Sequence, residues 1–133
     1  MKVILDTNVI IAAFATQGLC YLVFESTIAH HELILSPSLL GEIQNNLQRK
    51  LKLPPGRVKE VLSFLKAHST QTEDREASGL QCRDSEDLKV LALAVNSKAE
   101  AIVTGDQDLL ILKSVGDTSI LSPREFWNML RTL

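Results

Sequence analysis

The chain has 133 residues, of which 45% are hydrophobic and 23% charged, a composition that fits one globular domain and excludes a largely disordered protein. Its net charge is −2, which argues against a protein that binds nucleic acid through phosphate neutralisation alone. Aromatic residues make up 5% of the chain, so a platform that stacks nucleic-acid bases is not expected.

The first predicted elements are a strand and two helices. Residues 2–5 contain the apolar run Val3 to Leu5, with two β-branched residues, and an acidic residue follows them, which indicates a short buried strand. Residues 9–15 and 19–29 are predicted to be helices that Gly18 separates. The run 9–15 is the longest apolar run and is far shorter than the roughly 20 residues that span a bilayer, so we expect no membrane segment.

The middle of the chain continues the alternation of strands and helices. Residues 33–35 form a strand candidate, and Ser36 with Pro37 is typical of a helix N-terminus. Apolar residues then recur at helical spacing over 39–47 and, after a break at 53–56, over 58–65. Residues 69–83 are polar and are predicted to contain a short edge strand and a loop.

The last part of the chain begins with a predicted helix over residues 84–95 that is strongly apolar after its first turn, and a strand at 101–103 follows it. A turn at 104–106 is predicted to lead into a short helix that ends near Lys113, before a last strand at 119–121. Ser122 and Glu125 form a capping-box pattern that opens the final helix. Short strands alternating with helices predict a mainly parallel sheet covered on both faces, and no linker divides residues 1–133, so we expect one domain.

Acidic residues follow two of the predicted strands. Asp6 comes directly after the first strand, and Asp106 follows the strand at 101–103, with Asp108 behind it. Because parallel strands end at one edge of the sheet, topology brings these residues to the same edge. Helices that follow strands begin at that edge too, and they can add Glu42 and Asp87, with Asp84 nearby.

Such a group of carboxylates needs a cation. Two carboxylates about 5 Å apart repel by roughly 3 kcal/mol at an effective dielectric constant of about 20. Mg²⁺ or Mn²⁺ relieves this repulsion, binds oxygen ligands and activates water for attack on a phosphodiester. We therefore hypothesise metal-dependent phosphodiester hydrolysis, with RNA as the substrate. The polar residues at the same strand ends are second-shell candidates that orient carboxylates or waters: Thr7, Asn8, Ser36 and Thr104.

The same residues also have simpler interpretations. Asp84 and Asp106 can be helix N-caps, and Glu42 can be an ordinary solvated helix residue. Asp6 fits a capping role less well, because no capping box follows it. A basic run that includes Arg49, Lys50 and Lys52 can be a solvated surface or a rim that binds substrate. Cys20 and Cys82 form no metal or redox motif, and with no secretory pattern at the start we expect free thiols in a cytoplasmic protein.

The order and spacing of four segments resemble the PIN domain family, and within it the toxins of toxin–antitoxin pairs (VapC-like). These segments are Leu5 to Val9, Leu40 to Ile43, Arg83 to Asp87 with the apolar helix after it, and Val103 to Leu109. The resemblance implies a Rossmann-like three-layer α/β/α sandwich and a Mg²⁺- or Mn²⁺-dependent ribonuclease. It also implies a homodimer, silenced by a small antitoxin protein. The family's acidic quartet matches Asp6, Glu42, Asp87 and Asp106, and the accessory candidates are Asp108 and Asp84; Ser85 stands where relatives often have Pro.

Three alternatives remain open at this point. A phosphatase of the haloacid-dehalogenase type needs a second Asp two residues after the first, where this chain has Asn8. A phosphoacceptor receiver domain needs Lys after its last strand, where this chain has Ser122 and Pro123. In the third alternative, the chain is a catalytically silent scaffold that binds RNA or an antitoxin, and its acidic residues catalyse no reaction.

Overall fold

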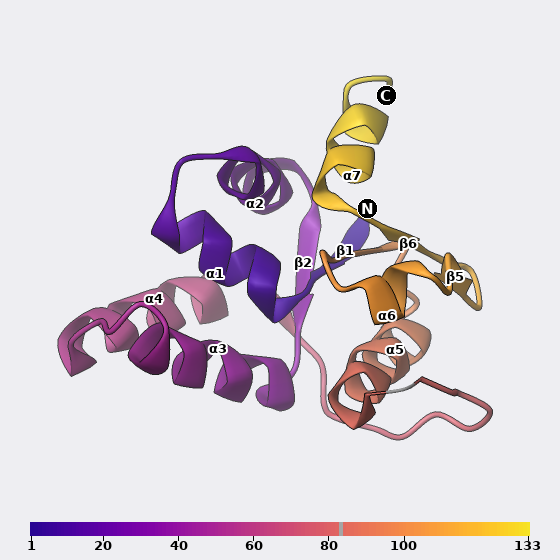
Figure 1. The fold of residues 1–133 in the computed structure, drawn as a ribbon, viewed down its shortest axis with the longest axis horizontal. Coiled ribbons are helices and arrows are strands. Elements are labelled where there is room, and N and C mark those ends of the chain that lie inside the picture. Colours follow the sequence, from indigo (N-terminus) through magenta and orange to yellow (C-terminus); the bar gives the residue numbers. More distant parts are fainter. Residues whose placement is uncertain (83) are drawn as a thin grey trace.

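A computed structural model describes residues 1–82 and 84–133, which form six strands and seven helices (Figure 1). The strands are β1 (Lys2–Leu5), β2 (Glu32–Leu35), β3 (Thr70–Gln71), β4 (Ala101–Val103), β5 (Ser114–Val115) and β6 (Thr118–Leu121). The helices are α1 (Thr7–Ala15), α2 (Leu19–His30), α3 (Pro37–Arg49), α4 (Pro55–Ala67), α5 (Ser85–Ser97), α6 (Gln107–Leu110) and α7 (Pro123–Leu130).

The strands form one sheet in the order β3-β2-β1-β4-β6-β5, parallel throughout except for the β5–β6 pair. The connections from β1 to β2 and from β2 to β3 run one way along the sheet, and those from β3 to β4 and from β4 to β6 run the other way. Right-handed crossovers therefore place α1 to α4 on one face and α5 and α6 on the other, as Figure 1 shows. This arrangement confirms the predicted α/β fold.

The core lies along the three central strands. The side chains from Val3 to Leu5 in β1, Leu33 to Leu35 in β2 and Ala101 to Val103 in β4 are at most 1% exposed. These strands are apolar at every buried position because helices cover both faces of the sheet. Leu91 and Ala94 of α5 are equally buried, as expected for a helix that is strongly apolar after its first turn. The strand ends at the C-terminal edge are thus fixed by a densely packed core.

Two sequence predictions of element boundaries are wrong. The first helix begins at Thr7 rather than Val9, because Asp6 caps it. The predicted helix near Lys113 ends earlier, at Leu110, and the chain forms the unpredicted strand β5. Gly116, at φ +55°, opens the two-residue turn that pairs β5 with β6, a position where a hairpin favours glycine.

Within the described residues, no single helix is long and apolar enough to cross a membrane. The consecutive helices α1 and α2 reach that length and hydropathy only as a pair, which is bent by 107°.

Candidate metal centre

The register of the sheet aligns the ends of three strands. Leu5 at the end of β1 pairs with Val103 of β4, and Val103 pairs with Leu121 of β6. The backbone N–H of Asp6 then donates to the carbonyl of Val103 at 2.9 Å, so the residue after β1 lies beside Thr104, the residue after β4. The predicted convergence of these two strand ends is therefore present in the structure.

Asp6 is held by two hydrogen bonds at this edge. The Thr104 hydroxyl donates to its Oδ2 at 2.7 Å, and the Thr7 backbone N–H donates to its Oδ1 at 2.9 Å, which makes Asp6 the N-cap of α1. The side chain is only 7% exposed. Burial raises the pKa of Asp6, the two hydrogen bonds oppose that rise, and the charge of Asp106 adds to it. Asp6 is thus both a cap and a buried acid.

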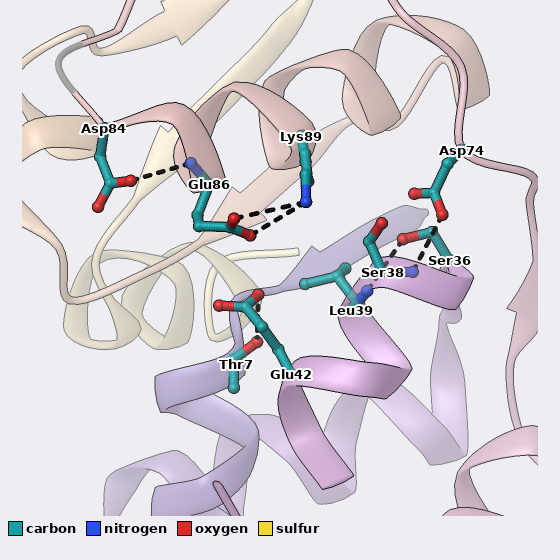
Figure 2. Close-up of polar contacts among 9 residues, drawn as sticks. All are labelled: Thr7, Ser36, Ser38, Leu39, Glu42, Asp74, Asp84, Glu86 and Lys89. Atoms are coloured by element: carbon teal, nitrogen blue, oxygen red, sulfur yellow. Dashed lines mark hydrogen bonds and ion pairs between the residues drawn. The ribbon is translucent and has the colours of Figure 1, made fainter. Parts of the chain in front are cut away.

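Glu42 joins the group from α3. Its Oε2 accepts a hydrogen bond of 3.2 Å from the Thr7 hydroxyl, and Figure 2 shows its carboxylate pointing toward Glu86 of α5. Burial is the largest cause that raises the pKa of Glu42, and the charges of Asp6 and Glu86 raise it further. The Thr7 hydrogen bond and the positive charge of Lys89 act in the opposite direction. Glu42 therefore lies within the electric field of the other acids.

The tightest group of carboxylates comes from α5 and the β4–α6 turn. One carboxylate oxygen each from Asp87, Asp106 and Asp108 lie within 4.8 Å of one another. Asp106 is held in place by its backbone N–H, which donates to the Thr104 hydroxyl at 3.0 Å. Its Oδ1 accepts from the backbone N–H of Asp108 at 2.9 Å and caps α6. The short turn thus brings two carboxylates to Asp87.

Among the acids of this group, Asp87 has the most strongly raised pKa. Its side chain is 7% exposed, and its pKa is raised to about 7. Burial is the largest cause, followed by the hydrogen bond and the charge of Asp106, and then by the charges of Asp84 and Asp6. A carboxyl that is half protonated near neutral pH indicates that burial and the neighbouring acidic groups together disfavour its charged form. This donor set of hard oxygen atoms fits a divalent cation such as Mg²⁺ or Mn²⁺.

The remaining acidic and polar candidates lie around this centre. Asp84 is exposed and caps α5 through the backbone N–H of Glu86 at 2.9 Å, although its charge reaches Asp87. The buried Ser36 hydroxyl caps α3 by accepting from the backbone N–H of Leu39 at 3.2 Å. Asn8 is exposed in the first turn of α1. Thr7 and Thr104 are therefore the two predicted second-shell residues that bond to the acidic side chains.

The basic candidates lie apart from the carboxylates. Arg49 is the last residue of α3, about two turns beyond Glu42, and Lys50 and Lys52 follow it on the surface. Lys89, whose Nζ lies 3.4 Å from Glu86, was not among the predicted site residues. The (i, i+3) spacing of Glu86 and Lys89 on a predicted helix was the available signal.

Cys82 was also missed as a neighbour of the centre. Its Sγ lies 3.9 Å from Oδ2 of Asp87 and 3.9 Å from the carbonyl oxygen of Asp108. No motif in the sequence indicates this position, because the chain between residues 72 and 84 has no regular periodicity. Arg83, part of one segment that carries the family resemblance, lies outside the described residues.

Comparisons with known proteins agree with this fold. A family model described as PIN domain matches residues 2–108. A chain of the VapBC2 complex from Rickettsia felis, solved bound to a DNA fragment from the promoter, has a TM-score of 0.65 at 16% identity, with 92% of this chain and 98% of that chain covered.

A second solved structure is VapC20 of Mycobacterium tuberculosis, described as a toxin that cleaves the sarcin–ricin loop. It has a TM-score of 0.60 at 12% identity, with 88% of this chain and 98% of that chain covered. At these identities the two structures show a shared fold. No curated protein matches the chain significantly.

Proposed function

The chain belongs to the PIN domain family, and on that premise we propose that it is a divalent-metal-dependent endoribonuclease and the toxin of a toxin–antitoxin pair. The observation that carries the proposal is the group of Asp87, Asp106 and Asp108, whose carboxylate oxygens lie within 4.8 Å of one another. Because the chain belongs to the PIN domain family, the phosphatase and receiver-domain alternatives are excluded.

The proposed catalytic residues are the four acids Asp6, Glu42, Asp87 and Asp106. They would hold Mg²⁺ or Mn²⁺, with Asp108 and Asp84 as accessory acids. A bound divalent ion supplies Lewis-acid chemistry, since it acidifies water and polarises the oxygens of a phosphodiester.

The surrounding residues have positioning roles in this proposal. Thr104 orients Asp6 through its hydroxyl, and Thr7 orients Glu42 in the same way. The raised pKa of Asp87 makes this side chain able to hold or release a proton near neutral pH.

The substrate is proposed to be RNA. The acidic residues alone would repel a polyanion, and a divalent cation reverses the sign of the local charge. Arg49, Lys50 and Lys52 are exposed at and just after the end of α3, where they would contact phosphates of a longer RNA. VapC20, which shares the fold, is described as cleaving the sarcin–ricin loop, a precedent for RNA cleavage by this fold.

The proposed partner is a small antitoxin protein. Its precedent is VapBC2, which shares the fold and was solved bound to promoter DNA. We also propose that residues 1–133 act as one domain, that the protein forms a homodimer, and that it works in the cytoplasm with Cys20 and Cys82 as free thiols.

Cleavage assays with matched variants test this function. Purified protein is incubated with structured and single-stranded RNAs and Mn²⁺, beside the variants Asp87→Asn and Asp117→Asn. Asp117 lies exposed in the β5–β6 turn and controls for the loss of one acid. Cleavage by the wild type and Asp117→Asn but not by Asp87→Asn is expected. Equal cleavage by all three proteins would identify a contaminating nuclease, and no cleavage with no bound metal would favour the silent scaffold.

A further inference from the structure

A pocket of about 440 Å³ opens beside the acidic residues, between the start of α3, one side of α5 and the segment 74–80. Its volume lies in the range of pockets that bind small ligands. Leu88, Ala92 and Leu93 of α5 form one wall, and Ala77 and Leu80 of the segment contribute to the other. The pocket is therefore a largely aliphatic slot with polar groups at its rim.

The segment that closes the pocket is held by two hydrogen bonds at its N-terminal end, at Asp74 and Arg75. The Asp74 carboxylate accepts from the backbone N–H of Ser38 in the first turn of α3 at 3.0 Å, as Figure 2 shows. The Asn96 side-chain amide, near the end of α5, donates to the carbonyl of Arg75 at 2.9 Å. These bonds join the start of the segment to two different helices, α3 and α5, which holds this side of the pocket in place.

Two cationic side chains line the pocket. Lys89 pairs with Glu86 at 3.4 Å, and Arg75 pairs with Glu73 at 3.4 Å, and all four side chains are more than half exposed. Exposed ion pairs of this kind contribute little free energy. Either cation can therefore exchange its carboxylate partner for a phosphate at small cost.

The pocket and the candidate metal centre share helix α5. Leu88, which lines the pocket, follows Asp87 directly in α5. The positive charge of Lys89 acts on Glu42, across the gap between α5 and α3.

We propose that this pocket binds one unpaired nucleotide of the RNA substrate, with the base between the aliphatic walls and a phosphate at Lys89 and Arg75. The proposal rests on the ribonuclease function proposed above and names a subsite for it. A base has apolar faces and a polar edge, which match the aliphatic walls and the rim groups Ser38 and Glu76. An apolar peptide side chain would fill the slot but would offer no anionic group to Lys89 and Arg75.

The proposal is tested by titrating the whole chain with AMP, GMP, CMP and UMP in EDTA. Amide NMR monitors each titration. At least one nucleotide is expected to bind in the millimolar range and to shift amides of Ser38, Leu88 and Ala92. Lys89→Gln is expected to weaken that binding about tenfold, as for loss of a charged hydrogen bond. Ala77→Trp is expected to block it. Lys98→Gln, exposed at the other end of α5, is the matched control and is expected to bind like the wild type.

Three results would overturn the proposal: no nucleotide binds, the shifted amides lie elsewhere, or Lys89→Gln and Ala77→Trp both bind as the wild type does. Unchanged nucleotide binding by Ala77→Trp, together with lost antitoxin binding, would assign the pocket to the protein partner. Because EDTA removes metal, the result is independent of cleavage. A protein that binds nucleotides here but cuts no RNA would refute the ribonuclease and leave the pocket assignment standing.

Discussion

The hydroxyl of Thr104 donates a 2.7 Å hydrogen bond to Asp6, a residue 98 positions earlier in the chain. The bond exists because β1 and β4 are neighbouring parallel strands that end at the same level. The same hydroxyl accepts from the backbone N–H of Asp106 at 3.0 Å. One threonine thus connects the acid of the first strand to the turn that carries two more.

Replacement of Thr104 by Val keeps the shape and removes both hydrogen bonds. We expect Mn²⁺ affinity and kcat/KM to fall about 10- to 100-fold, as for the loss of other groups that orient metal ligands. The free energy of unfolding should fall by about 1–3 kcal/mol, since buried groups lose their partners. Calorimetry, cleavage rates and urea unfolding measure the three effects.

Thr118→Val is the matched control for that variant. Thr118 is as buried as Thr104 and donates to the carbonyl of Ala99 at 2.6 Å, away from the acids. It should lose stability and retain Mn²⁺ affinity. If both variants bound Mn²⁺ equally well, Thr104 would have no role in positioning Asp6.

Thr7→Val should have a smaller effect on kcat/KM, about tenfold, because Glu42 is partly solvated and keeps water as an alternative donor. Thr7→Ser keeps the hydroxyl and should restore most of the activity. Steady-state cleavage of one RNA by the three proteins measures this series. Equal loss in Thr7→Ser and Thr7→Val would attribute the effect to packing of the methyl group.

The raised pKa of Asp87 predicts how the stability of the metal-free protein depends on pH. Its folded-state pKa is about 7, above the ordinary value of about 3.9 in an unfolded chain. Between these values the folded state binds more protons, so the free energy of unfolding should decrease as pH rises from about 4 to about 7. Asp6 and Glu42, whose pKa values are also raised, act in the same direction.

Urea unfolding in EDTA at several pH values measures this dependence, with Asp87→Asn as the control. The variant should lose less stability than the wild type as pH rises. Added Mn²⁺ should stabilise the wild type more at pH 8 than at pH 6, because binding no longer has to displace a proton. The same pH dependence in wild type and variant would show that Asp87 is not the group responsible.

Asp106→Asn should lower the pKa of Asp87. The hydrogen bond and charge of Asp106 both raise that pKa, and burial, the largest cause, remains in the variant. We therefore expect a value below 7 that stays above the ordinary one. Carboxyl NMR titration of Asp87 in the metal-free protein measures it, with Asp117→Asn as the control. An unchanged pKa would mean that the two carboxyls do not interact.

Much of the fold was predictable from the sequence, because three local signals agreed. Apolar β-branched runs marked the central strands, helical spacing marked α3 and α4, and Ser122 with Glu125 marked α7, where the structure contains the capping box. The strand β5 was missed because its two residues are too short for any periodicity to show. Its signal was the pair Gly116 and Asp117, which is typical of a hairpin turn.

The positions of the acids were predictable for a different reason. Parallel topology alone brings the residue after β1 and the turn after β4 to one edge of the sheet. Asp6 and Asp106 could therefore be placed near each other although they are far apart in the sequence. Lys89 and Cys82 could not be placed in the same way. Their positions depend on side-chain direction and on an irregular segment, which neither topology nor periodicity determines. The roles assigned to all these residues stay predictions.

Mn²⁺ binding to the wild type and to Asp106→Asn, measured by calorimetry near pH 7 in two buffers of different ionisation enthalpy, tests the central claim most directly. The account predicts that the wild type binds Mn²⁺ and releases protons, so that the observed heat changes with the buffer, and that Asp106→Asn loses most of the affinity. No binding by the wild type, or equal binding by both proteins, would contradict it.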